Sequence, residues 1–230
     1  MPPIITHTHS FSSIKPLILY SHTKGPNPWK VALVLEELDI PYDSRYLEFE
    51  ETKIEPYLSL NPNGKLPALE DPNHNVYLFE SGSIIEYLVE SYDHKLVLTP
   101  VTFQERLLAR SWMHFQMSSQ GPACGFKVWI NRTYAVEDTV VANEYLGREI
   151  KRIIGILDSH LKKTGNLYIV GSKISFADLV WVPHFLMLDV FLPGYNPGTE
   201  YPSFTSWLYR LKGRASVQSI QAAKSALAKP

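Results

Sequence analysis

The chain has 230 residues and a formal net charge of −1, with 45% hydrophobic and 20% charged residues. This composition is typical of globular proteins, and so small a net charge gives no long-range attraction to nucleic acid or acidic membranes. A single cysteine, Cys124, excludes an intrachain disulfide, and no stretch approaches the roughly 20 apolar residues that span a bilayer. We therefore expect a cytoplasmic protein that binds neither nucleic acid nor membranes.

Residues 1–15 are expected to form a flexible arm. After this arm, short β-like runs alternate with helical patterns. Strands are expected over 16–21, 42–49, 66–71 and 75–80, and helices over 28–38, 53–60 and 81–92. The helix over 28–38 is expected to be amphipathic, because Val31, Val34, Leu35 and Leu38 lie on one face. A strand, a helix and a strand in series require a right-handed crossover and a parallel pair, and the last two strands form a hairpin. This order predicts a thioredoxin-like domain over 16–93 with a mixed four-stranded sheet.

The remaining chain is predicted to be all-helical. A linker over 94–103 precedes a helical domain over 104–230. Helix faces are defined by apolar residues at helical spacing, namely Leu108, Trp112 and Phe115 with Ser111, and then Leu146, Ile150, Ile153, Leu157 and Leu161. Further helices are expected over 176–188, 203–212 and 215–226. Pro183 should kink the first of these or end it early.

The motif "NPNGKLPALED" places Pro67 at the start of a strand, where a proline costs little. A cis Leu66–Pro67 bond would swing the backbone of Leu66 outward. Leu66 would then offer its N–H and C=O to an extended, peptide-like ligand, as the edge of a sheet does. The alternative is an ordinary turn into an edge strand.

The motif "FESGSIIEYL" begins a helix in which Ser81 or Ser83 can act as the cap, with Glu80 just before it. That structural role is the simpler interpretation. The functional one is that the helix N-terminus and a free hydroxyl bind a carboxylate while Glu80 binds an ammonium group. Together they would hold the head group of an α-amino acid.

These stretches carry a family resemblance. "GPNPWKVALVLEEL", "LNPNGKLPALED" and "LFESGSIIEYL" resemble the amino-terminal domain of cytosolic glutathione transferases, and the helical remainder is similar to their second domain. "GPNPWKV" and "GPACGF" resemble the fungal branch that contains the yeast nitrogen-catabolite regulator, a prion protein, and its enzymatic relatives. The resemblance covers the chain from Pro16 to about Ala226.

The stretch "SKISFADLVWV" resembles the folding box of the same family. Ser175 is the expected N-cap and Asp178 stands three residues later, which is the spacing of a capping box. Its expected role is structural.

The resemblance implies that the glutathione sulfur lies beside the loop after the first strand. Thiolate is the nucleophile, and a free thiol with a pKa of about 8.5 is mostly protonated at neutral pH. The position of the catalytic serine in serine-type classes falls on Gly25, which has no donor side chain. The branch implies Asn27 as the activating residue, with Ser21 and Thr23 as alternatives.

The resemblance also implies which residues contact the rest of the glutathione molecule and the second substrate. The glutathione-binding residues would be Lys53, Lys65, Leu66, Pro67, Glu80 and Ser81. Lys53 is a substitute, because the family's histidine position holds Thr52. The second-substrate pocket would be lined by Phe115, Gln116, Ser119 and Cys124, although Cys124 also fits a packed apolar role.

The expected function is that of a glutathione transferase. It would add glutathione thiolate to an electrophilic small molecule, a xenobiotic in detoxification or an intermediate of secondary metabolism, with peroxidase side activity. The alternatives are a glutathione-binding regulatory or ligand-carrier protein with little catalysis, and a glutathione-dependent isomerase. Glutathione is the expected co-substrate, no metal is expected, and the resemblance implies a homodimer.

Overall fold

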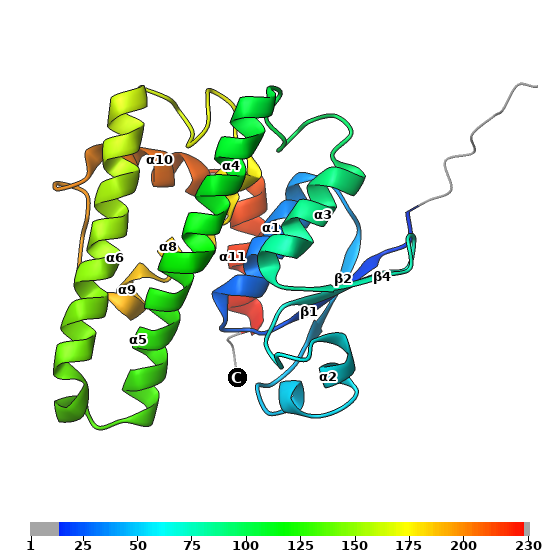
Figure 1. Ribbon diagram of the computed structural model, residues 1–230, viewed down its shortest axis with the longest axis horizontal. Coiled ribbons are helices and arrows are strands. Elements are labelled where there is room, and N and C mark those ends of the chain that lie inside the picture. The colour runs from blue at the N-terminus through cyan, green and yellow to red at the C-terminus, as the bar shows by residue number, and fades with distance from the viewer. Residues whose placement is uncertain (1–13, 228–230) are drawn as a thin grey trace, which may run out of the picture.

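The computed structural model describes residues 14–227, in which a sheet with helices on both faces lies beside a larger helical part (Figure 1). The arm expected over 1–15 lies outside the described residues except for its last two. The sheet part consists of β1 (Leu17–Ser21), α1 (Pro26–Glu37), β2 (Tyr42–Tyr46), the 3₁₀ turn η1 (Glu51–Lys53), α2 (Tyr57–Leu60), β3 (Ala68–Asp71), β4 (Val76–Phe79) and α3 (Ser81–Tyr92).

The four strands form one mixed sheet in the order β2-β1-β3-β4. β1 and β2 are parallel and are joined through α1, whereas β1–β3 and β3–β4 are antiparallel. This arrangement confirms the thioredoxin-like fold that the order of elements predicted.

Alternate residues of β1 pack on opposite faces of the sheet, as the period of a strand requires. Leu17 and Leu19 belong to the large core on the side of α1 and α3. Tyr20 and Ile18 belong to a smaller cluster on the other face, where Tyr57 of α2 also lies. Both faces of the sheet are therefore covered.

Helix α1 differs from the amphipathic helix that its sequence predicts. Residues Pro28–Leu35 are all buried, including Lys30, whose pattern position is on the polar side. The reason is that α1 lies between the sheet and the helical part, which packs against it through α11 and α8 (Figure 1). A helix that is covered on all sides has no solvent-facing stripe.

The helical part begins with a long rod in which α5 continues α4, and α6 runs back beside it (Figure 1). A π-helical turn, η2, separates α4 from α5. The bounds are α4 (Phe103–Phe115), η2 (Gln116–Gln120), α5 (Gly121–Thr133), α6 (Val136–Thr164), α7 (Phe176–Leu179), α8 (Val182–Phe185), α9 (Leu188–Phe191), α10 (Pro202–Lys212) and α11 (Ala215–Leu227).

The helix expected over 176–188 is three short helices, α7, α8 and α9. Pro183 lies in the first turn of α8, a position where its missing N–H costs nothing and its fixed φ suits the helix. The break therefore falls before the proline, and the chain turns at Val180 and Trp181.

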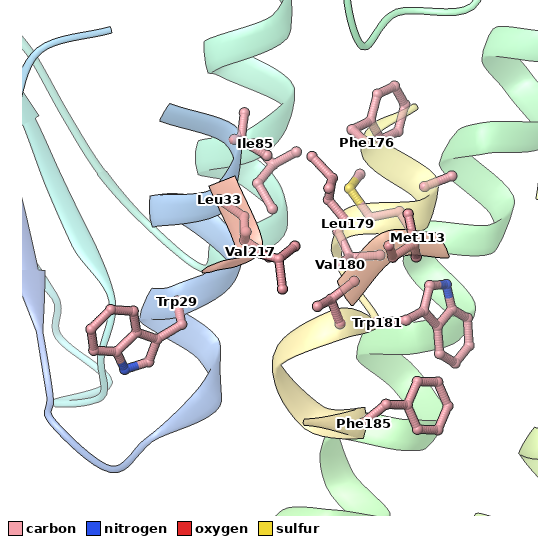
Figure 2. Packing of buried hydrophobic residues seen from close by; sticks show 14 of the residues in the cluster. Trp29, Leu33, Ile85, Met113, Phe176, Leu179, Val180, Trp181, Phe185 and Val217 are labelled. Carbon is pink, nitrogen blue, oxygen red and sulfur yellow. The ribbon is translucent and has the colours of Figure 1, made fainter. Parts of the chain in front are cut away.

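The sheet part and the helical part share one hydrophobic core. In Figure 2, Leu33 of α1, Ile85 of α3 and Val217 of α11 face Leu179 and Val180 from the segment after α6. Because the core is continuous, α1 is held in place from two directions. Among the described residues, no helix is both long enough and apolar enough to cross a membrane.

Asp178 is the polar centre of the helical core. Its fully buried carboxylate accepts hydrogen bonds from the N–H of Ile169 (2.8 Å), from Nε1 of Trp207 (2.8 Å), and from N and Oγ of Ser175 (3.0 and 3.1 Å). The expected pairing of Ser175 with Asp178 is present, and it is joined by two donors from distant parts of the chain. Burial raises the pKa of Asp178, while these donors act in the opposite direction.

Asp178→Ala is expected to lower the free energy of unfolding by about 3 kcal/mol or more, because it leaves buried donors of Ile169 and Trp207 unpaired at about 1–3 kcal/mol each. Asp189→Ala is the matched control, since its exposed carboxylate accepts, within residues 14–227, only from the N–H of Gly194, and it should cost less than about 1 kcal/mol. Urea unfolding of both variants measures the difference. Equal losses in the two variants would contradict a central role for Asp178.

Candidate functional site

The loop between β1 and α1 is organised by His22, which the sequence analysis did not single out. Its Nδ1 accepts hydrogen bonds from the backbone N–H groups of Lys24 (3.0 Å) and Gly25 (3.2 Å), and its carbonyl accepts from Nε1 of Trp29 (3.1 Å). The buried ring stacks on Phe49 with centroids 4.0 Å apart. Burial lowers the pKa of His22, so the neutral ring with its proton on Nε2 fits these contacts.

Helix α1 begins directly after this loop and leaves one backbone donor free. The first four N–H groups of a helix have no intrahelical acceptor. Here Pro26 and Pro28 have no N–H, and the N–H of Gly25 is donated to His22. The N–H of Asn27 is therefore the remaining donor of the first turn. The side chain of Asn27 has an unpaired group of the opposite kind, because its Oδ1, an acceptor, is buried without a partner among the described residues.

The two alternatives to Asn27 lie in the loop before the helix. Ser21 is the buried last residue of β1, and its carbonyl accepts from the N–H of Leu47 at 3.0 Å. Thr23 is half-buried in the loop. Gly25 has φ −68° and ψ 135°, which any residue adopts, and a Cβ there would meet only Cβ of His22 at 3.9 Å. The backbone therefore does not require glycine at the position of the missing hydroxyl.

The segment before β3 holds Leu66 in a fixed position. The Leu66–Pro67 peptide is cis, as predicted. The carbonyl of Lys65 accepts from the hydroxyl of Tyr57 and from Nδ2 of Asn61, both at 2.6 Å. The pairing of β3 with its neighbours begins after this point, so the backbone of Leu66 stays outside the ladder.

A second set of contacts fixes Gly64 in the same loop. Its carbonyl accepts from Oγ1 of Thr52 at 2.9 Å and from the ammonium of Lys53. Gly64 has φ +58°, and a Cβ there would lie 2.8 Å from the carbonyl oxygen of Thr52, so only glycine fits. Lys53 thus has a structural contact, whereas Lys65 is exposed.

Glu80 has an unusual backbone conformation at the N-cap of α3. Its φ is 68° and its ψ 120°, a left-handed conformation that is costly for any residue with a side chain. The side chain is exposed and does not cap the helix. Buried Ser81 follows in the first turn. Strained residues of this kind cluster at ligand sites, so Glu80 is a candidate binding residue.

The start of α3 also touches the π-turn η2. A Cβ at Gly82 would lie 2.4 Å from Sδ of Met117, so glycine allows the two elements to approach closely. π-Turns inside helices occur often at functional sites.

Lys30 and Gln116 join α1 to η2, and Lys30 is the second residue that the sequence analysis missed. The ammonium of Lys30, which is 1% exposed, donates to Oε1 of Gln116 at 2.6 Å. Nε2 of Gln116 lies 2.9 Å from Oε1 of Gln120 and 3.3 Å from Nδ1 of His184. Burial lowers the pKa of Lys30 to about 7, and the charge of Glu80 acts in the opposite direction.

The four residues expected in the second-substrate pocket are not brought together. Gln116 and Cys124 are both buried near Lys30, and Ser119 lies half-buried in η2. The ring of Phe115 instead packs inside the helical part, 5.5 Å from that of Trp181. It also lines a separate hollow of about 240 Å³ with Leu108, Ser111, Trp112 and His160. Burial raises the pKa of Cys124 to about 12, so its thiol is protonated and inert.

Comparison with known proteins agrees with the two-part fold. The models of the glutathione S-transferase N-terminal and C-terminal domains match residues 15–90 and 137–215. The glutathione S-transferase-like protein OpS6 of Beauveria bassiana is 58% identical over 217 residues, covering 94% of this chain and 100% of that protein. Protein URE2 of Saccharomyces bayanus is 29% identical over 236 residues, covering 86% of this chain and 67% of that protein.

Among solved structures, the glutathione transferase URE2P6 from Phanerochaete chrysosporium, in complex with oxidized glutathione, superimposes with a TM-score of 0.85 at 35% identity. The match covers 93% of this chain and 98% of that one. The chain therefore belongs to the glutathione S-transferase family, among its fungal, Ure2-like members.

Proposed function

We propose that the chain binds glutathione through its sheet part and transfers the glutathione thiolate to an electrophilic small molecule. The observation that carries this proposal is Glu80, an exposed acid held in a left-handed backbone at the start of α3. Nothing in its own helix uses its side chain. An ion pair between Glu80 and the ammonium group of a ligand would explain why this strained backbone conformation is kept.

The remaining glutathione contacts follow from the same loops. The γ-glutamyl carboxylate would lie at the N-terminus of α3 beside Ser81, where the helix dipole favours an anion. The backbone of Leu66, which lies outside the strand ladder, would pair with the cysteinyl residue. Exposed Lys65 would neutralise the glycyl carboxylate, with Lys53 beside it.

The sulfur would then lie at the first turn of α1. The free N–H of Asn27, the Nδ2 donor of its side-chain amide and the helix dipole would all stabilise a thiolate there. Ser21 and Thr23 remain the alternative donors. The electrophile would lie between this turn and η2, near Ser119. It would be a xenobiotic or a biosynthetic intermediate, and peroxide reduction and isomerisation would use the same thiolate.

A second candidate is a glutathione-binding regulatory or carrier protein with little catalysis. Gly25 favours it, because the usual hydroxyl is missing although the backbone would accept a side chain. The URE2 relatives are also consistent with it. In either case we propose a homodimer, as the family resemblance implies.

Glu80→Ala is expected to weaken glutathione binding by about 1.5–3 kcal/mol, the value of a hydrogen bond to a charged group. That corresponds to about 10- to 150-fold in affinity. Glu137→Ala, which removes an exposed acid from the first turn of α6, is the matched control and should not change binding. Calorimetric titration of the parent protein and both variants measures their affinity for glutathione. No binding by the parent protein, or equal binding by both variants, would refute the proposed site.

Asn27→Ala is expected to raise the pKa of the thiol of bound glutathione by about 0.7 unit, because an amide donor to the thiolate is worth about 1 kcal/mol. Asn27→Asp keeps the shape but adds a negative charge, so it should raise the pKa further. Ultraviolet titration of the bound thiolate measures both. If the curve of Asn27→Ala coincides with that of the parent protein, Asn27 only shapes the helix start, and Ser21 and Thr23 become the next residues to replace.

Gly25→Ser tests whether the missing hydroxyl limits catalysis. The position accepts a side chain, so we expect normal folding and a rate with a generic aryl halide about tenfold higher, since a hydroxyl bond to an anion is worth about 1.5–3 kcal/mol. Gly25→Ala is the control for the added Cβ and should not be faster. A parent protein that binds glutathione but gives no turnover, with no gain from serine, would favour the carrier role.

A further inference from the structure

Lys30 is a buried cation without a counter-ion in contact. Within residues 14–227, no carboxylate oxygen lies within 4 Å of its ammonium, whose hydrogen-bond acceptor is the uncharged amide of Gln116. Burying a charge without a paired opposite charge is costly. The burial that causes this cost also lowers the pKa of Lys30 to about 7.

The groups that face Lys30 do not neutralise it. His184 of α8 is neutral, because burial and the nearby cations lower its pKa well below the usual range. Cys124 of α5 is a protonated thiol. Glu80, whose charge acts to raise the pKa of Lys30, is exposed at the start of α3. A second cation, Lys224 of α11, also acts on His184.

Lys30 lies where the two proposed binding regions meet. It stands three residues after Asn27, so both residues lie on one face of α1. Through Gln116 it reaches η2, which also carries Ser119. Lys224 adds to the positive potential at this end of the helix, since its ammonium lies 5.8 Å from the centroid of the Trp29 ring.

We propose that Lys30, held by Gln116, is a positioning residue that favours an anion at the first turn of α1 and fixes η2 beside it. The anion would be the glutathione thiolate, so the inference rests on the proposed function. In a region of low dielectric constant, a protonated lysine favours a nearby thiolate over the neutral thiol, and the thiolate in turn favours the protonated form of Lys30. The bond to Gln116 ties that charge to the wall of the electrophile pocket.

Stability alone does not account for Lys30. Replacing a buried polar pair with apolar residues of similar volume is often neutral or stabilising. The neighbours of Lys30 in α1, Val31 and Leu33, are fully buried apolar residues, so an apolar side chain suits this environment. If Lys30 serves only the fold, removing its charge should lower the stability of the protein. If Lys30 serves the site, the protein should still fold, and the reactivity of the bound thiol should fall instead.

The test is Lys30→Met together with the double variant Lys30→Met, Gln116→Leu, which removes both hydrogen-bonding partners. Lys127→Met is the matched control. Lys127 is a half-buried lysine of α5, and it donates to O and Oδ1 of Asn143, both at 2.9 Å. For every variant, glutathione affinity, the pKa of the bound thiol, the kinetics with an aryl halide and the melting temperature are measured.

We expect the double variant to fold with an unchanged or higher melting temperature, and Lys30→Met alone to fold with a lower one, because it leaves the buried Oε1 of Gln116 unpaired. Both should bind glutathione within about threefold of the parent affinity. The pKa of the bound thiol should rise by about one unit. At neutral pH kcat should fall about tenfold, and the pH–rate profile should move to higher pH by the same unit. Lys127→Met should leave the pKa and the profile unchanged.

The inference is overturned if the thiol pKa of both Lys30 variants equals that of the parent protein. It is also overturned if both variants unfold, because Lys30 would then serve the fold. A parent protein that binds no glutathione is a different result, which removes the proposed function itself. Calorimetry on the parent protein therefore separates the two failures.

Discussion

The packing of α1 on both sides is the constraint on which the rest of the structure depends. One side of the helix meets the sheet through Leu17 and Leu19, and the other meets the helical part near Val217 and Val180. Because no face is left for solvent, α1 cannot shift without disturbing both parts. Its N-terminus therefore has a fixed position relative to the loops of Leu66 and Glu80 and to η2.

Most of the fold could be predicted from local patterns. The alternation of strands and helices, the hairpin before α3 and the cis bond before Pro67 all follow from short stretches of sequence. The amphipathic reading of α1 was wrong because the spacing of Val31, Val34 and Leu35 reports one buried face, whereas contacts with α8 and α11 bury the other. Pro183 indicated a kink or an early end of the helix over 176–188, but only packing decides that three short helices result.

The same distinction between local patterns and long-range packing applies to the candidate site. Glu80 and Leu66 stand in compact motifs, so a sequence can indicate them. Lys30 looks like a solvent-facing residue, and its partner Gln116 is 86 positions away, so nothing local could reveal the pair. The role of His22 could have been predicted from the sequence. In a turn-rich loop, a polar side chain often accepts hydrogen bonds from the backbone N–H groups two and three residues later, as His22 does here.

The two ends of α1 differ in how completely their polar groups are satisfied. At its C-terminal end, Glu37 forms a bidentate pair with Arg214, with both bonds at 2.6 Å. At its N-terminal end, Oδ1 of Asn27 is buried without a partner among the described residues, and Lys30 has no acid in contact. The costs of unpaired groups thus collect at one end of a single rigid helix. A ligand that offers an anion and a donor there would satisfy both groups at once, which is why we place the proposed glutathione sulfur at this end of α1.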